Sequence, residues 1–193
     1  MKFFNKEETK SLIIIFIILI AISIPNFASS IKRSRDQVRR DDMGAILDAL
    51  ISYRDDFGIF PPSRDGMILG CKKDGAVAQM DSTGKLVVDL VPCQWGKDSL
   101  VDLTPGGSKV YLKKMPSDPD LNKGVTYTYF SDGSTFQVFG SFEETRQPEY
   151  DQKIVSRNIK CGARICNMGR FFGCTTDKSL EQCQEERFLK KTN

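Results

Sequence analysis

The residues best suited to chemistry are six cysteines, in a chain of 193 residues that contains no histidine. Cys71 and Cys93 bracket a loop-rich segment, and we predict a disulfide between them that stabilises the fold by roughly 3 kcal/mol through chain entropy. The C-terminal section holds the other four, Cys161, Cys166, Cys174 and Cys183. Because these four include no Cys-x-x-Cys pair, two disulfides in one of three connectivities are favoured over a zinc site. Six paired cysteines indicate an oxidising compartment.

The remaining residues give little support for catalysis or for a cofactor. The commonest general base is missing without histidine, no serine or cysteine lies in a nucleophile motif, and residues 104–107 lack the Lys and Ser/Thr of a phosphate-binding loop. Asp118, Asp120 and Asp132 offer carboxylates to calcium, but a role in turns is favoured. A net charge of +3 is too small to indicate nucleic-acid binding. We therefore expect a non-enzyme with no cofactor and no specific nucleic-acid partner.

One long helix is expected to position everything else. Residues 12–24 are apolar apart from Ser23, and a helical period continues through residues 31–57. As a single helix, residues 12–57 would be roughly 70 Å long, which is more than a compact domain of this size can cover. Half of the helix must therefore be buried in something other than its own domain. Pro25 removes a backbone donor and is expected to kink or loosen the helix without ending it.

Phe4, Glu8 and Pro25 stand at the first, fifth and twenty-second positions of the segment that contains this apolar run. Their spacing resembles the N-terminal segment of type IV pilins and of the pseudopilins of type II secretion, whose mature chains have Phe, Glu and Pro at those positions. Residues 53–61 look like the helix exit of the same families. The families have Gly before the first Phe, whereas this chain has Phe3. The resemblance covers about the first third of the chain.

The resemblance implies a structural subunit that packs into a filament through its N-terminal helix, with Phe4, Glu8 and Pro25 as assembly residues. In the resembled families the Glu neutralises the N-terminal ammonium of an adjacent subunit, so Glu8 would set the docking register. The implied partners are copies of this chain, other pilin-like subunits, an inner-membrane assembly platform, and the lipid bilayer before assembly. The implied location is the cell membrane with an extracytoplasmic head, and the cell surface once a filament forms.

A second hypothesis is a secretory signal or simple anchor for an adhesive or binding domain that is stapled by disulfides and does not polymerise. The basic start, the short apolar run and the small residues 28–30 fit this hypothesis. A cleaved signal, however, gives no reason for the helical period to continue beyond Ser30. The continuing period therefore favours the pilin-like anchor.

A basic patch follows the apolar run. It consists of Lys32, Arg33, Arg35, Arg39 and Arg40. Because acidic Asp41 and Asp42 come next, the patch suits ion pairing between subunits in a packed helix bundle. A solvated helix face and a contact with phospholipid head groups are the alternatives for any one of these arginines.

Local patterns predict the elements beyond the helix. Residues 125–130 and 135–139 are rich in β-branched and aromatic residues and flank an Asp-Gly turn at 131–134, which predicts a β-hairpin. Ser179 and Gln182 indicate a capping box that opens a terminal helix. Trp95, which follows Cys93, is expected to pack on the predicted disulfide.

Together these features predict an α+β, pilin-like fold, in which a long N-terminal helix packs on a small antiparallel β-sheet and a disulfide-rich C-terminal extension follows. Residues 1–30 are expected to form the membrane or filament-core half-helix, residues 31–58 the amphipathic half of the same helix, and residues 59–193 a globular head domain.

Overall fold

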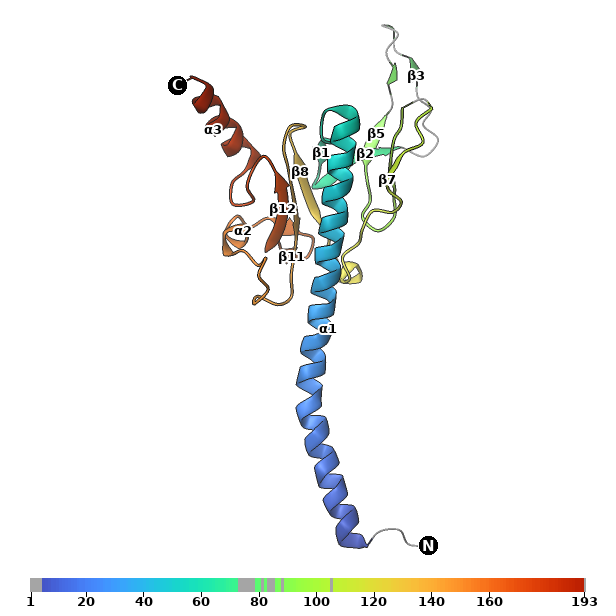
Figure 1. Cartoon of the computed structure of the whole chain (residues 1–193), viewed down its shortest axis with the longest axis vertical. Helices are drawn as coiled ribbons and strands as arrows, with labels where there is room; N and C mark the ends of the chain where they lie inside the picture. Colours follow the sequence, from blue (N-terminus) through green and yellow to red (C-terminus); the bar gives the residue numbers. More distant parts are fainter. Residues whose placement is uncertain are drawn as a thin grey trace.

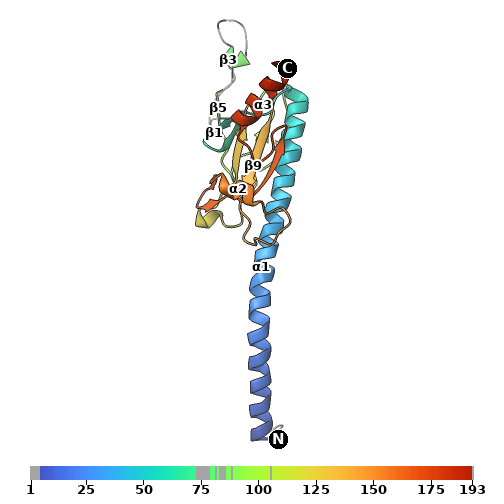
Figure 2. The same ribbon diagram turned by 90° about the vertical axis from the view of Figure 1, so that its left-hand side faces the viewer.

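One helix, α1 (Lys6–Phe57), dominates the structure, a computed structural model that describes residues 5–72, 79–80, 82, 86–87, 89–104 and 106–192. The helix runs through Pro25 without a break, and at 1.5 Å per residue its 52 residues span about 78 Å. Figures 1 and 2 show its N-terminal half standing clear of the head and its C-terminal half lying against it. The predicted long helix is therefore confirmed.

Both ends of α1 have local sequence causes. The Asn5 side chain accepts a hydrogen bond from the backbone N–H of Lys6, and the Glu8 carboxylate accepts one from the backbone N–H of Asn5, which completes a capping box. The helix therefore begins among the polar residues, six positions before the apolar run. At the other end Gly58 adopts a φ of 76°, which only glycine reaches without strain, and its N–H bonds to the carbonyl of Arg54.

The core sheet consists of three antiparallel strands in the order β12-β9-β8, with bounds Met168–Phe172, Phe136–Gly140 and Thr128–Ser131. The central strand β9 is buried along its whole length. Met43, Ile46 and Leu50, spaced as one helical face, are fully buried against the sheet side of the core. The long helix thus covers the sheet with one residue from each of three successive turns of its C-terminal half.

The predicted hairpin is confirmed as β8 and β9, with a later start than expected. Val125 forms only an isolated bridge with Gly162, and regular pairing begins at Thr128 opposite Phe139. The turn is held by Asp132, whose carboxylate accepts hydrogen bonds from the backbone N–H groups of Ser134 (2.9 Å) and Thr135 (2.7 Å).

Smaller elements complete the head. β2 pairs with β1 on one side and with β5 on the other, β3 pairs with β4, β6 pairs with β7, and β10 pairs with β11. Their bounds, together with those of the short helices, are β1 Ser63–Arg64, β2 Met67–Lys72, β3 Gln79–Met80, β4 Leu86–Val87, β5 Leu90–Pro92, β6 Leu100–Val101, β7 Val110–Leu112, η1 Leu121–Lys123, α2 Gln152–Ser156, β10 Lys160–Cys161, β11 Arg164–Ile165 and α3 Leu180–Thr192. These pieces flank the core sheet and α1 (Figure 1).

All six cysteines are paired, so the zinc alternative is wrong. The predicted Cys71–Cys93 bond joins β2 to β5, and the four C-terminal cysteines form Cys161–Cys166 and Cys174–Cys183. Trp95 is buried in the same core cluster as Cys71 and Cys93, and its ring packs edge-on against Tyr127 at 5.7 Å between centroids. The ring of Tyr127 is thus the aromatic partner of Trp95, which the sequence did not indicate.

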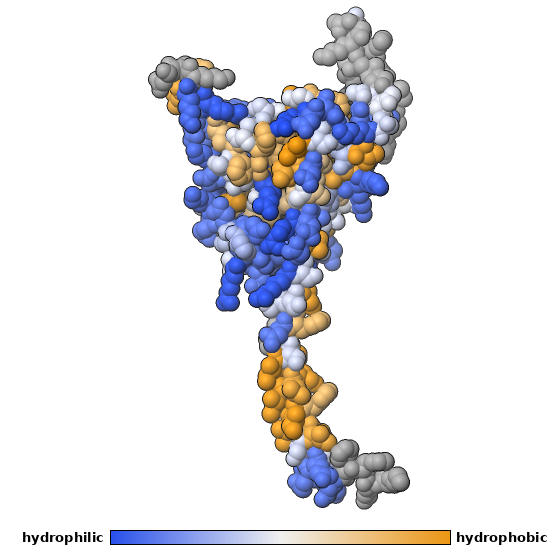
Figure 3. All heavy atoms as spheres, in the orientation of Figure 1, coloured by the Kyte–Doolittle hydropathy of each residue, from blue (hydrophilic) through white to orange (hydrophobic). Residues whose placement is uncertain are grey.

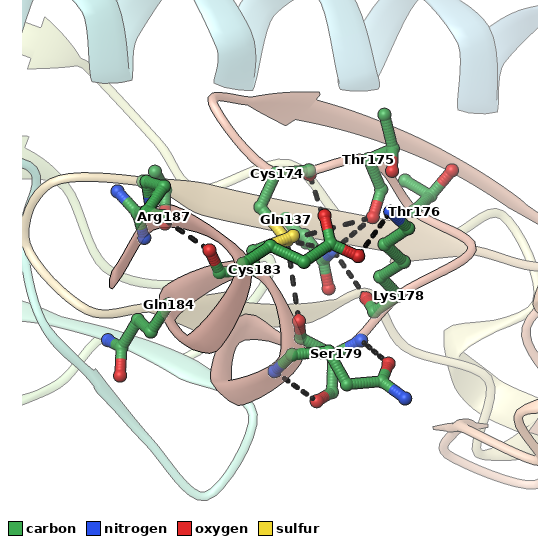
Figure 4. Close-up of a disulfide and its surroundings, with 12 residues drawn as sticks. Gln137, Cys174, Thr175, Thr176, Lys178, Ser179, Cys183, Gln184 and Arg187 are labelled. Atoms are coloured by element: carbon green, nitrogen blue, oxygen red, sulfur yellow. Dashed lines mark hydrogen bonds and ion pairs between the residues drawn. A yellow bond between two sulfur atoms is a disulfide. The ribbon is translucent and has the colours of Figure 1, made fainter. Parts of the chain in front are cut away.

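The Cys174–Cys183 disulfide joins the segment that follows β12 to helix α3 (Figure 4). The buried Gln137 amide of β9 donates hydrogen bonds to the carbonyls of Thr175 (2.6 Å) and Lys178 (2.8 Å). The predicted capping box is confirmed, because Ser179 and Gln182 exchange side-chain to backbone hydrogen bonds. The C-terminal extension is therefore fixed to the sheet by both covalent and polar contacts.

The disulfides are expected to rank by the length of chain that they close. Cys71 and Cys93 are 22 residues apart, whereas Cys161 and Cys166 are 5 apart. Chain entropy then predicts that the double change C71A with C93A lowers the free energy of unfolding by roughly 3 kcal/mol, and C161A with C166A by roughly 2 kcal/mol. Urea unfolding of the detergent-solubilised chain, followed by Trp95 fluorescence, measures both values. A reversed order, or free thiols in the untreated protein, would contradict this pairing.

Candidate functional site: the exposed apolar half of helix α1

The apolar half-helix, residues 12–27 of α1, is an apolar surface that the rest of the described chain leaves uncovered. Its large apolar side chains keep between 43% (Ile20) and 69% (Phe27) of their surface exposed. The most apolar 18-residue window of α1 has a mean hydropathy of 2.6, and no part of that window is buried by the rest of the described chain. Because consecutive residues are exposed, the exposure runs around the helix, and Figure 3 shows one face of it as an orange column below the head. The helix is thus long and apolar enough to cross a membrane.

Uniform exposure has a large energetic cost in water. Burying one Leu, Ile or Phe side chain fully contributes about 1.5–3 kcal/mol, so covering this half-exposed set contributes on the order of 10 kcal/mol. A helix that is apolar on all sides belongs inside a membrane or inside a protein core. The apolar half-helix therefore needs surroundings that this chain does not itself supply.

Polar groups bound the apolar half-helix at its N-terminal end. Glu8 serves the capping box, at 2.8 Å from the backbone nitrogen of Asn5, and Glu7 forms an exposed ion pair of 2.8 Å with Lys10. Glu8 and Pro25 lie at opposite ends of the apolar half-helix, about 26 Å apart along the axis. Phe4, the third predicted assembly residue, lies outside the described residues. Within one chain the structure therefore does not bring Glu8 and Pro25 together.

Near Pro25, polar side chains bond to the helix backbone. Pro25 has no N–H to donate to the carbonyl of Ala21. Within two residues of Pro25, two side chains bond to carbonyls one turn earlier in the helix. The Ser23 hydroxyl donates to the carbonyl of Leu19 (2.7 Å), and the Asn26 amide donates to the carbonyl of Ile22 (3.3 Å). The helix remains continuous here, so the predicted loosening is not a break in the isolated chain.

Above the apolar half-helix, a buried ionic cluster fixes α1 to the head, and sequence reasoning missed it. The Arg39 cluster consists of Arg39 and four carboxylates, Asp36, Asp118, Asp120 and Glu143. The guanidinium of Arg39 is fully buried, and it donates to Asp118 through Nε (2.7 Å) and Nη2 (2.9 Å), to Asp36 (2.8 Å), to Asp120 (3.1 Å) and to Glu143 (3.0 Å). Asp118 and Asp120 lie just before η1, and Glu143 follows β9, so the cluster joins three separate segments.

A second ring of charges balances this cluster. Arg35 bonds to Glu143 through two nitrogens, while Arg164 and Lys123 each lie 2.8 Å from Asp120. The hydrogen bond from Lys123, helped by Arg164 and Arg39 and opposed by burial, lowers the pKa of Asp120 to about 2. Burial opposes the charge of Arg39, but hydrogen bonds and attraction from Asp118 raise its pKa. Hydrogen bonds and opposite charges in the cluster thus favour the charged forms of Asp120 and Arg39.

The Arg39 cluster corrects one expectation, while the predicted turn role of Asp118 stands, since Asp118 accepts the backbone N–H of Asp120 (2.7 Å). The predicted ion pairing between subunits is wrong for Arg35, Arg39 and Arg40, because each pairs within its own chain. Arg35 binds Glu143, Arg39 binds Asp118, and Arg40 binds Glu149 at 2.7 Å. The carboxylates of Asp118 and Asp120, considered above as calcium ligands, instead bind cationic side chains of this chain. Among the described residues, no group of three His, Cys, Asp or Glu side chains could hold a metal ion. The one available signal was position: Arg39 falls on the same helical face as Met43, Ile46 and Leu50.

Removal of the Arg39 guanidinium should weaken the attachment of the head to the helix. We expect Arg39→Met to lower the free energy of unfolding by about 3–5 kcal/mol, because it leaves buried carboxylates without a cation. Arg40→Met is the matched control, since its ion pair with Glu149 is one-quarter exposed on both sides and is worth about 1 kcal/mol or less. Urea unfolding measures both variants. Equal losses would mean that the Arg39 cluster holds nothing together.

The Arg39 cluster also predicts an acid-sensitive head. The pKa of Asp120 is about 2 in the folded chain against an ordinary value of 3.8, so its contribution to stability is present above about pH 4 and is lost as the pH falls towards 2. Asp120→Asn should flatten the pH dependence of the urea midpoint over that interval. An unchanged slope in this variant would contradict the assignment.

Comparison of this chain with protein-family models, curated proteins and solved structures finds no match.

Proposed function

We propose that this chain is a structural subunit of a membrane-assembled filament, of the kind formed by type IV pilins or secretion pseudopilins. The observation that carries the proposal is the apolar half-helix, which is uncovered on every side and is continuous with a helix that is fixed to a folded head. Such a surface needs lipid before assembly and equally apolar neighbours after it. Parallel packing of many copies supplies the second environment.

The membrane stage fits the length of the exposed apolar surface. Residues 12–27 span about 23 Å as a helix, somewhat less than the hydrocarbon thickness of about 30 Å, and polar residues bound them on both sides. The three disulfides favour a head outside the cytoplasm. Before assembly, the subunit would thus be anchored in the membrane, with its head outside the cytoplasm and its N-terminus within the bilayer or on the cytoplasmic side.

Glu8 would supply the register of assembly. A carboxylate moved beside an apolar core is costly unless a cation pairs with it, so one docking position becomes better than its neighbours. An exposed N-terminal ammonium at Phe4 of an adjacent copy is the partner that the resemblance implies. If the terminus lies further upstream, Lys6 or Lys10 of a neighbour replaces it. In either case Glu8 must leave its bond to Asn5 or share it.

The capping role of Glu8 favours a rival function. Because the Glu8 carboxylate is already bonded to the N–H of Asn5 in a single chain, it needs no second copy to satisfy it. A simple membrane anchor that carries an adhesive or binding head would use Glu8 only in this way. The two functions therefore differ in whether the charge of Glu8 matters.

The deciding variants are Glu8→Gln and Glu8→Ala. Glutamine retains the capping acceptor and loses the charge, whereas alanine loses both. We expect electron microscopy of sheared surface material to show filaments containing the wild-type chain and none from either variant, while all three chains remain in the membrane fraction. Glu7→Gln serves as the control, because it removes a neighbouring exposed charge.

Two kinds of result would contradict this account: the first contradicts only the register role of Glu8, and the second contradicts the filament itself. If Glu8→Gln gives filaments as abundant as those of the wild type, the charge of Glu8 does not set the register, and Glu8 serves only as part of the helix cap. A wild-type chain that forms no filaments, or whose mature N-terminus lies near Ser30, would assign the chain to the anchored binding domain.

A further inference from the structure

We propose that a polar pocket at the base of the head binds the phosphate of an anionic membrane phospholipid. The pocket has a volume of about 320 Å³ and lies between α1 and the segment that follows β9. Its lining consists of Arg33, Gln37 and Arg40 from the helix, and Glu144, Arg146 and Gln147 from the head. Nothing in the filament function itself requires this site, although its occupant depends on the membrane insertion proposed above.

The charges in the pocket leave two guanidinium groups available. Arg40 is paired with Glu149 and also donates to the side chain of Gln147 (3.1 Å). Arg33 and Arg146 are exposed, and within the described part of the chain neither has a carboxylate within ion-pair distance. Glu144 is the one carboxylate of the lining. The pocket therefore carries a net positive charge that its own residues do not neutralise.

The position of the pocket selects a lipid rather than a soluble anion. Arg33 lies six residues beyond Phe27, the last exposed apolar residue of the apolar half-helix, which is about 9 Å along the axis. The head-group layer of a bilayer is about 5–8 Å thick on each side, and an arginine side chain reaches several ångströms further. Figure 3 shows hydrophilic residues gathered at the base of the head, with a short stretch of mixed polar and apolar residues between them and the orange column. A phospholipid held here would lay its acyl chains along the apolar half-helix.

The residue types select the phosphate as the group bound. A guanidinium presents parallel N–H donors that match two oxygens of a phosphate, and it carries its charge at every physiological pH. The Gln147 amide nitrogen adds a neutral donor beside them, whereas the amide nitrogen of Gln37 donates to Asp41 (2.8 Å). Because two free cations outnumber Glu144, a head group without its own cation, such as phosphatidylglycerol, fits better than phosphatidylcholine.

Lipid titration of the purified full-length chain in a neutral detergent, read by native mass spectrometry, tests this site. We expect one phosphatidylglycerol to bind in preference to phosphatidylcholine of the same chain length. Arg33→Gln and Arg146→Gln should each weaken phosphatidylglycerol binding about fivefold, and Glu144→Gln should tighten it. Arg64→Gln is the control, since Arg64 is an exposed arginine in β1 outside the pocket and should leave the affinity unchanged.

Each alternative occupant has its own outcome. Equal phosphatidylglycerol binding by the wild type and by both pocket variants would overturn the site, and inorganic phosphate that binds as tightly and displaces the lipid would overturn the lipid in favour of a soluble anion. Carbonate extraction of membranes separates this failure from that of the proposed function. A chain that resists extraction but shows no lipid preference contradicts only the pocket, whereas a chain released by carbonate contradicts both.

Discussion

A single continuous helix that must satisfy two environments is the constraint on which the structure depends. Its C-terminal half buries Met43, Ile46 and Leu50 in the head, while its N-terminal half offers apolar side chains to no part of the described chain. Because α1 continues past Pro25 as one helix, the two halves are connected without a break. Whatever covers the apolar half-helix therefore also fixes the orientation of the head.

The Arg39 cluster fixes one position of α1 relative to the sheet. Apolar contacts alone would tolerate small rotations or shifts of α1 against the sheet, whereas five charged side chains with hydrogen bonds of 2.7–3.1 Å tolerate one arrangement. Asp36 extends this fit by accepting the backbone N–H groups of Glu143 (2.9 Å) and Glu144 (3.0 Å). The same network positions residues 144–147 beside Arg33, so the pocket at the base of the head is a consequence of how the helix is locked.

Local patterns predicted those parts of the fold that local chemistry decides. The long helix, the Asp132 turn, the capping box at Ser179 and the Cys71–Cys93 bond each depend on residues close together in the chain or on a clear pairing requirement. The Arg39 cluster could not be found in this way, because Asp118 and Glu143 lie 79 and 104 residues from Arg39. Charge on an otherwise apolar helical face was the only trace it left in the sequence. The capping role of Glu8 was likewise hidden, because the helix begins among polar residues that resemble a linker.

The most direct measurement of the central claim is photo-crosslinking from the apolar half-helix in intact cells. A benzoylphenylalanine placed at Phe16, which is 65% exposed, reports what covers this surface, and one placed at Leu121, 40% exposed on the head, serves as the reference. If copies of the chain exchange lipid for one another, position 16 should give a ladder of covalent multimers that position 121 does not give. Crosslinks from position 16 to lipid alone, in cells that display the protein on their surface, would contradict the account and leave a solitary membrane anchor.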